Sequence, residues 1–113
     1  MNKIKKPWGW EKLIEQNERY IVKQLFMKAG CQCSLQYHED KIETITVLEG
    51  ELTIKLGHNG KCRKDRILKP FESLTILTNQ VHRMYSEKDC LYLECSTPEL
   101  QDVIRLEDDY GRV

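Results

Sequence analysis

The chain has 113 residues, 18 basic and 18 acidic side chains, and 40% hydrophobic residues, so its formal net charge is zero. The length suits one domain, and the balanced charge argues against a nucleic acid as partner. No apolar run approaches the roughly 18 residues of a membrane-spanning helix. No apolar stretch follows the basic N-terminus as it would in a secretory signal. We therefore expect one globular domain over residues 1–113, without a nucleic-acid or membrane partner.

The cysteines indicate a reducing compartment. There are five, an odd number, and no two of them form a Cys-x-x-Cys pair (Cys31, Cys33, Cys62, Cys90 and Cys95). This pattern predicts neither a disulfide framework nor a thiolate zinc site. We expect free thiols and a cytoplasmic protein.

Short runs of β-forming residues, separated by turns, make up most of the chain. In chain order, we predict a short helical segment at 11–16, strands at 19–27, 33–38, 43–48, 51–56, 64–68, 73–77, 81–85 and 90–95, and a second short helical segment at 98–104. The second begins with proline, a helix-start residue. The glycine-rich segment 57–60 predicts a hairpin turn with His58 in solvent. Turns spaced about 8–12 residues apart are typical of an all-β sandwich or barrel.

Four polar side chains have the types and positions of metal ligands. Gln36 and His38 are two residues apart, so on one strand they share a face. Glu43 opens the next strand after a polar turn, which brings it near both, and His82 follows a turn farther along. An amide oxygen, two imidazoles and a carboxylate suit a divalent cation. The alternatives are a core histidine at 38 and an amide at 36 that only bonds its neighbours.

The spacing of these residues resembles the first cupin motif, through Gly30, Gln36, His38, Glu43 and Gly50. That motif normally has His-x-His where this chain has Gln-x-His. The second cupin motif ends in a metal-binding histidine and corresponds here to residues 77–82. Asn79 takes the place of a glycine, and asparagine tolerates the same left-handed conformation. The resemblance implies a double-stranded β-helix, a jelly-roll-like barrel.

Three longer segments resemble the phosphomannose isomerase cupins, the C-terminal domains of type II bifunctional enzymes. They are Pro-Trp-Gly at 7–9, Ser-Leu-Gln-Tyr-His at 34–38, and Asp-Val-Ile-Arg-Leu-Glu-Asp-Asp-Tyr-Gly-Arg at 102–112. The resemblance implies interconversion of mannose 6-phosphate and fructose 6-phosphate. We expect a stand-alone cupin, because no nucleotidyltransferase segment precedes it, and we expect Trp8 and Trp10 to cover one end of the barrel.

The resemblance also implies roles for individual residues. The metal site would be Gln36, His38, Glu43 and His82, holding Zn2+, with Mn2+, Fe2+ or Ni2+ as alternatives. A cation must hold the phosphate, and the candidates are Lys23, Lys41, Arg83, Arg105 and Arg112. We favour Lys41, beside the ligands, and Arg105, in the best-matched segment, as catalytic residues. The alternatives to a catalytic role are that Lys41 is solvated and that Arg105 pairs with Glu107 or Asp108. The sequence names no general base.

Two departures from the family leave other functions open. Lys41 stands where the family has arginine, and Thr44-Ile45 stands where it has His-Trp. A metal-dependent sugar-phosphate isomerase is the first hypothesis. The alternatives are a metal-binding cupin with other chemistry, such as an oxygenase or a sugar-nucleotide modifying enzyme, and a non-catalytic sugar-binding module. Exposed sheet edges favour a homodimer.

Overall fold

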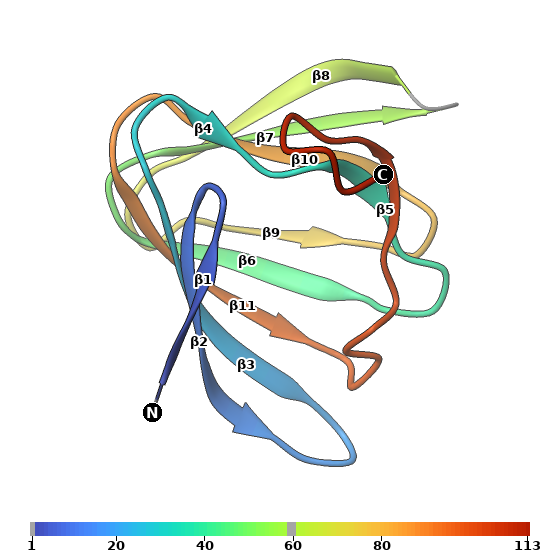
Figure 1. Cartoon of the computed structure of the whole chain (residues 1–113). Coiled ribbons are helices and arrows are strands. Elements are labelled where there is room, and N and C mark those ends of the chain that lie inside the picture. Colours follow the sequence, from blue (N-terminus) through green and yellow to red (C-terminus); the bar gives the residue numbers. More distant parts are fainter. Residues whose placement is uncertain (1, 59–60) are drawn as a thin grey trace.

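The computed structural model describes residues 2–58 and 61–113, apart from the side chains of residues 58, 61 and 63. The two ends of the predicted hairpin at 57–60 are paired strands, whereas its residues 59 and 60 and the predicted exposure of His58 lie outside this description. The strands form two antiparallel sheets that face each other (Figure 1). This is the all-β architecture that the sequence predicts.

The first sheet has six strands in the order β1-β2-β3-β11-β6-β9. Their bounds are β1 (Lys3–Lys6), β2 (Gly9–Gln16), β3 (Ile21–Met27), β11 (Cys90–Ser96), β6 (Glu43–Glu49) and β9 (Ser73–Ile76). The second sheet runs β12-β5-β10-β7-β8, and β4 also pairs with β10. Its strands are β12 (Ile104–Glu107), β5 (Leu35–Tyr37), β10 (Val81–Ser86), β7 (Leu52–His58), β8 (Lys61–Leu68) and β4 (Cys31–Gln32).

Alternating side chains of both sheets fill the space between them. On β6, Ile45 and Val47 are fully buried, and from the opposite sheet so are Leu52 and Ile54. Residues two apart share a face of a strand, so one face of each strand is apolar. Burying each such side chain contributes about 1.5–3 kcal/mol. The core therefore fixes the register of β6 and places Glu43, two residues before Ile45, on the same inward face.

The two predicted helical segments are wrong, because the described residues contain no helix. Residues 11–16 belong to β2, and an irregularity between Leu13 and Glu15 disturbs the alternation that would have marked a strand. An isolated helix of this length is not stable in water, whereas pairing with β1 and β3 gives hydrogen-bond partners to the backbone N–H and C=O groups of this segment. Residues 98–103 form successive turns, in which the amide of Leu100 donates to the carbonyl of Pro98 over 2.8 Å.

The Pro-Trp-Gly segment has a steric reason for its glycine. A Cβ at Gly9 would lie 1.8 Å from the carbonyl oxygen of Phe26 on the neighbouring strand. Trp8 is buried in the core, whereas Trp10 lies on the outer face, where its ring stacks on Phe26 with the centroids 5.8 Å apart. The expectation that both tryptophans cover a barrel end is therefore wrong for Trp10.

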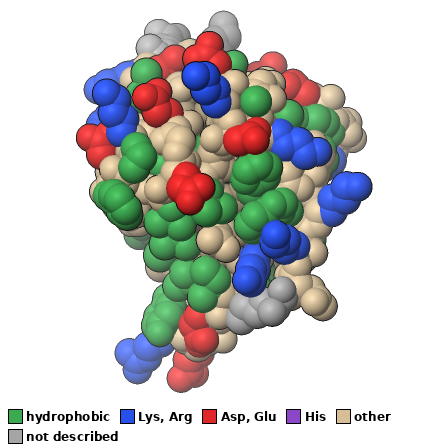
Figure 2. Space-filling model, turned by 90° about the vertical axis from the view of Figure 1, so that its left-hand side faces the viewer, with side chains coloured by type: hydrophobic (Ala, Val, Ile, Leu, Met, Phe, Trp, Pro, Cys, Tyr) green, Lys and Arg blue, Asp and Glu red, His purple; other side chains and the backbone are tan. Residues whose placement is uncertain are grey.

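Basic and acidic side chains lie among hydrophobic ones on the face drawn in Figure 2, rather than forming a block of one sign. This matches the balanced composition. Among the described residues, no helix is long and apolar enough to cross a membrane.

Candidate metal centre

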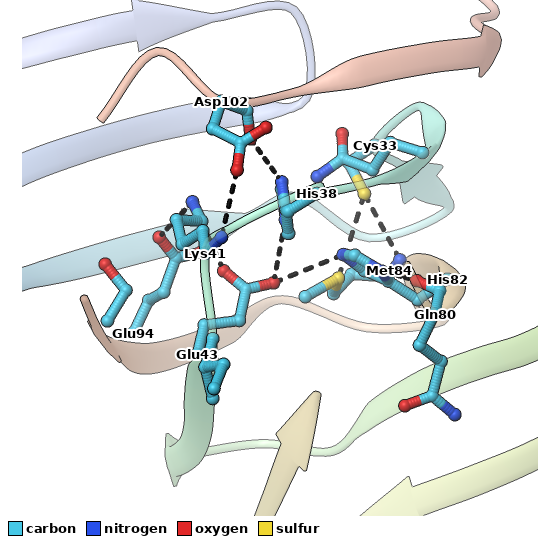
Figure 3. A network of polar contacts seen from close by, with 12 residues as sticks. Cys33, His38, Lys41, Glu43, Gln80, His82, Met84, Glu94 and Asp102 are labelled. Carbon is cyan, nitrogen blue, oxygen red and sulfur yellow. Dashed lines mark hydrogen bonds and ion pairs between the residues drawn. The ribbon is translucent and has the colours of Figure 1, made fainter. Parts of the chain in front are cut away.

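Three predicted ligands converge between the two sheets (Figure 3). His38 follows β5, Glu43 begins β6 and His82 lies on β10. The Nε2 atoms of His38 and His82 lie 3.3 and 3.2 Å from Glu43 Oε1. All three residues are at most 1% exposed. The expectation that the polar turn after His38 closes a hairpin with Glu43 is wrong, because β5 and β6 belong to different sheets. The three residues meet because the two sheets face each other.

The second nitrogen of each imidazole determines what the first one offers. The Nδ1 atom of His38 lies 2.6 Å from the carbonyl oxygen of Asp102, and that of His82 lies 2.9 Å from the carbonyl oxygen of Gln80. A carbonyl only accepts, so both Nδ1 atoms carry the proton. In the neutral imidazoles, each Nε2 then carries a lone pair that faces Glu43 Oε1. Three acceptors thus face one point, which a bound cation would satisfy.

Glu43 is ionised in this cluster. Burial opposes its charge, but hydrogen bonds from His38 and His82 in their protonated forms and the charge of Lys41 outweigh that effect and hold the pKa of Glu43 well below its usual value. In the neutral forms of the imidazoles, a bound cation would take the place of those protons. Lys41 Nζ lies 3.5 Å from Glu43 Oε2. Among the described residues, Glu43 Oε2 and His82 Nε2 are buried without a hydrogen-bond partner. Buried polar atoms without a hydrogen-bond partner are rare, so these two atoms support the binding of a cation by this cluster.

The donor set fits a divalent metal. His38, Glu43 and His82 could hold an ion with two imidazole nitrogens and one carboxylate oxygen. Zinc sites with three protein ligands commonly use such a set and leave a position open. Gln36 lies opposite His82 in the strand register, so both face inward. Its amide oxygen accepts a hydrogen bond from the Ser34 hydroxyl, so as placed it is engaged by a neighbour.

Two segments remote in sequence hold His38 and its loop in place. Asn79 adopts the left-handed conformation expected for it, with φ 62°. Its backbone amide donates to the carbonyl of His38 over 2.6 Å. The Asp102 carboxylate accepts hydrogen bonds from the backbone amides of residues 39, 40 and 41 over 3.1, 2.7 and 2.9 Å. Asp102 therefore fixes both the histidine and the turn that follows it, a role that the sequence did not reveal.

A cavity of about 340 Å³ opens beside this cluster. Its charged lining residues are five cations and two carboxylates, namely Lys6, Lys23, Lys41, Arg105, Arg112, Glu11 and Glu94. The excess of positive charge is local, because the whole chain is neutral. The cavity is within the usual size range of small-molecule sites and favours an anionic ligand.

The two residues predicted to be catalytic both line this cavity. Lys41 is buried rather than solvated, and it reaches Glu94 Oε2 at 3.7 Å as well as Glu43. Arg105 does not pair with its neighbours, since Asp108 binds Arg112 at 2.8 Å instead. In the part of the chain that the structure describes, Arg105 Nε is buried without a partner.

The family departure at residues 44 and 45 falls outside the lining of the cavity. Thr44 faces the outside of the sheet, where its hydroxyl lies 2.9 Å from that of Thr75. Ile45 is fully buried in the core.

The other cations that were predicted as phosphate-binding candidates differ in position. Lys23 and Arg112 line the cavity, whereas Arg83 is absent from its lining and lies 3.7 Å from Asp109.

Two cavity carboxylates were missed by the sequence interpretation. Glu11 lies between Lys6 and Lys23, with each of its oxygens 2.9 Å from one ammonium. Glu94 lies on β11 beside Lys41, and burial together with the charge of Glu43 raises its pKa to about 7. Both sit on strands whose pairing brings them to the site, so no local spacing signalled them.

The chain is similar to known proteins along nearly its whole length. The family described as "Mannose-6-phosphate isomerase C-terminal" matches residues 1–108. The chain belongs to this family. It is 32% identical to the mannose-1-phosphate guanylyltransferase ManC of Salmonella typhimurium over 97% of its length, and 29% identical to the xanthan biosynthesis protein XanB of Xanthomonas campestris. It spans about a quarter of those proteins, 23% and 24% respectively.

Solved structures show the fold. An RmlC-like cupin from Shewanella frigidimarina matches with a TM-score of 0.75 and 12% identity, over 88% of this chain and 86% of that one. The predicted cupin barrel is thereby confirmed. At 12% sequence identity, the similarity establishes the fold and says nothing about function.

Proposed function

We propose that this protein is a metal-dependent sugar-phosphate isomerase that interconverts mannose 6-phosphate and fructose 6-phosphate. The observation that carries the proposal is the buried cluster of His38, Glu43 and His82 beside a cation-lined cavity, which His38 borders. The family to which the chain belongs supports the substrate class. The reaction moves a proton between two adjacent carbons of an open-chain sugar.

His38, Glu43 and His82 would hold the ion, for which we propose Zn2+, with Gln36 as a fourth ligand. When bound, the ion would supply Lewis-acid polarisation of the sugar's carbonyl oxygen. The three ligands are buried away from bulk water, and the cavity meets the site at His38.

Arg105 is proposed to bind the phosphate. In the strand register it lies opposite Gln36, which in turn lies opposite His82, so the three form one inward row across β12, β5 and β10. Two strand spacings separate the backbones of Arg105 and His82 by roughly 10 Å. That separation and the unpartnered Nε of Arg105 among the described residues suit a phosphate at the far end of an extended sugar.

Lys41 is proposed to balance charge at the inner end of the cavity. Its ammonium lies between the carboxylates of Glu43 and Glu94, 3.5 and 3.7 Å away. This engagement also favours the second candidate, a non-catalytic sugar-binding module, because a lysine held by two carboxylates lacks the planar grip of an arginine. The variant Lys41→Arg separates the two: a higher isomerase rate supports the enzyme, and no gain supports the binding module.

The direct test is conversion of mannose 6-phosphate by the purified chain. The protein is stripped of metal, reloaded with Zn2+, Mn2+, Fe2+ or Ni2+, and assayed for fructose 6-phosphate. We expect turnover that requires one of these ions and disappears in His82→Ala. Tight sugar-phosphate binding without turnover by any metal form would favour the binding module, and oxygen uptake with Fe2+ would favour other metal chemistry.

We further propose a homodimer formed through an exposed sheet edge, and a reducing cytoplasmic setting. All five cysteines are free thiols in the structure. Edge strands such as β9 and β8 carry backbone groups that a second copy could pair with. Sedimentation of the purified chain would test the dimer.

A further inference from the structure

Glu94 lies next to the metal cluster without belonging to it. It sits in the middle of β11, opposite Ile45 of β6, and its side chain lines the cavity. The side chain is 11% exposed, so its carboxylate is enclosed by protein yet open to the cavity. Lys41 Nζ contacts both Glu94 Oε2 and Glu43 Oε2, so the two carboxylates are joined through one ammonium (Figure 3).

The other proton acceptors of the cavity are engaged elsewhere. Both oxygens of Glu11 are bound by lysines at 2.9 Å. The Cys33 thiol contacts the carbonyl of Ser34, and burial raises its pKa to about 12. Burial raises the pKa of Tyr92 as well, so neither group is a base near neutral pH. His38 points its free nitrogen at Glu43.

We infer that Glu94 is the residue that carries the proton between the two reacting carbons, an inference that rests on the proposed isomerase function. A carrier for this reaction must be next to the metal cluster, open to the substrate cavity and not held at hydrogen-bond distance by a cation, and the ion pair of Glu94 with Lys41 is 3.7 Å long, against 2.9 Å for both oxygens of Glu11. Among the described residues that line the cavity, Glu94 meets these three conditions. A single carboxylate suffices, because the proton leaves and returns on neighbouring carbons.

The step balances without another reactant. The Glu94 carboxylate takes the proton from C2 of the open-chain aldose, and the C–H electron pair becomes the C1–C2 double bond. The carbonyl electron pair moves to O1, which takes up the proton of the O2 hydroxyl. A lone pair on O2 then forms the new carbonyl while C1 takes the proton back from Glu94. No oxidant or reductant is needed, and the carboxylate is regenerated.

The test compares zinc-loaded wild-type protein with Glu94→Gln in deuterated water, with mannose 6-phosphate as the probe. We expect the variant to retain wild-type zinc content and mannose 6-phosphate binding. We expect both isomerisation and deuterium incorporation at C2 to fall by about 100-fold or more, the usual contribution of a positioned acid–base group. Glu87→Gln, which neutralises an exposed carboxylate, is the matched control and should behave as wild type.

The outcomes separate this inference from the proposed function. If wild-type protein shows neither isomerisation nor exchange with any of the four metals, the isomerase function itself fails, and this inference with it. If wild type is active and folded Glu94→Gln exchanges C2 deuterium at the same rate, only the role of Glu94 is overturned. Should Glu94→Gln fail to fold, Glu94→Asp keeps the charge but shortens the side chain by one methylene, which moves the carboxylate away from the cavity. A wild-type exchange rate in that variant would also overturn the inference.

Discussion

The inner end of the cavity and its mouth are built from different parts of the fold. At the inner end, His38 lines the cavity and Glu43 and His82 lie behind it. The three come from the end of β5, from β6 and from β10, and they are almost fully buried. At the mouth, the charged residues come from strands added at the sheet borders, such as Lys6 on β1 and Arg105 on β12. In Figure 1 the C-terminal segment crosses from the end of β11 to β12, linking the two sheets.

This difference separates two tasks. The inner end has three acceptors with fixed directions, which is what metal binding requires, and the rigid core strands supply that precision. The mouth has an excess of cations, which is what selection of an anionic ligand requires. If the division holds, changes at the inner end should alter metal affinity, and changes at the mouth should alter substrate affinity.

Glu43→Gln should have the largest effect, because it replaces the oxygen that both histidines face with a neutral amide. Zinc affinity, measured by competition with a coloured chelator, should fall by more than about 100-fold, beyond the effect of altering a supporting residue. Glu49→Gln, on the same strand but exposed, is the matched control and should bind zinc as wild type. Equal zinc affinity in Glu43→Gln would show that the inner end is not the metal site.

Arg105→Gln tests the mouth. Loss of a charge-assisted bond to phosphate costs about 1.5–3 kcal/mol, so KM for mannose 6-phosphate should rise by about 10- to 150-fold. Zinc affinity should not change, which distinguishes this variant from Glu43→Gln. Arg66→Gln, an exposed arginine on β8, serves as the control. A rise in KM that is matched for unphosphorylated mannose would contradict phosphate binding by Arg105.

Asp102→Asn should affect both regions, because Asp102 lies on the C-terminal segment yet holds the turn after His38. The backbone bond to His38 Nδ1 survives, but the side chain loses an oxygen acceptor. We expect zinc affinity to fall by about 10-fold, the lower range for a residue that supports a ligand. A zinc titration that gives wild-type affinity would mean that the segment acts only at the mouth.

Asp108→Asn should have the smallest effect and a distinct pH dependence. A hydrogen bond from Arg112 lowers the pKa of Asp108 from 3.8 to about 2. A lowered pKa contributes stability above the unfolded value of 3.8, and that contribution is lost as the pH falls through about 2. We therefore expect Tm at pH 7 to fall by about 4 °C.

At pH 2 the variant and wild type should converge. Asp65→Asn, an exposed aspartate on β8, controls for loss of charge alone. A difference in Tm that persists unchanged at pH 2 would contradict the role of the Arg112 bond.

The sequence predicted the parts of the site that depend on short spacing. Gln36, His38 and Glu43 lie within eight residues of chain, and Asn79 precedes His82 by three residues, so short spacings indicated which side chains belong to the site, although Gln36 and Glu43 lie on strands of different sheets. Most strands were likewise predicted, because their inward faces are apolar. The strands β1 and β12 were missed, and residues 11–16 of β2 were assigned to a helix. These strands are rich in polar residues, and a register irregularity interrupts both β2 and β12.

Residues placed by long-range pairing could not be predicted. Glu94 reaches the cluster only because β11 lies between β3 and β6, and Asp102 only because the C-terminal segment folds back over residues 39–41. The residues that flank Glu94 and Asp102 in the sequence form the same kind of pattern as those around an exposed carboxylate. The burial of Lys41 was missed for the same reason, since Glu94, its partner, lies 53 positions later in the chain.

The most direct test of the account is the metal content of the wild-type protein, purified without chelators and measured by elemental analysis beside His82→Ala. The central claim is that His38, Glu43 and His82 hold a divalent ion. We predict about one equivalent of a single divalent metal per wild-type chain and a loss of nearly all of it in the variant. A metal-free wild-type protein that takes up no Zn2+, Mn2+, Fe2+ or Ni2+ on titration would contradict the claim.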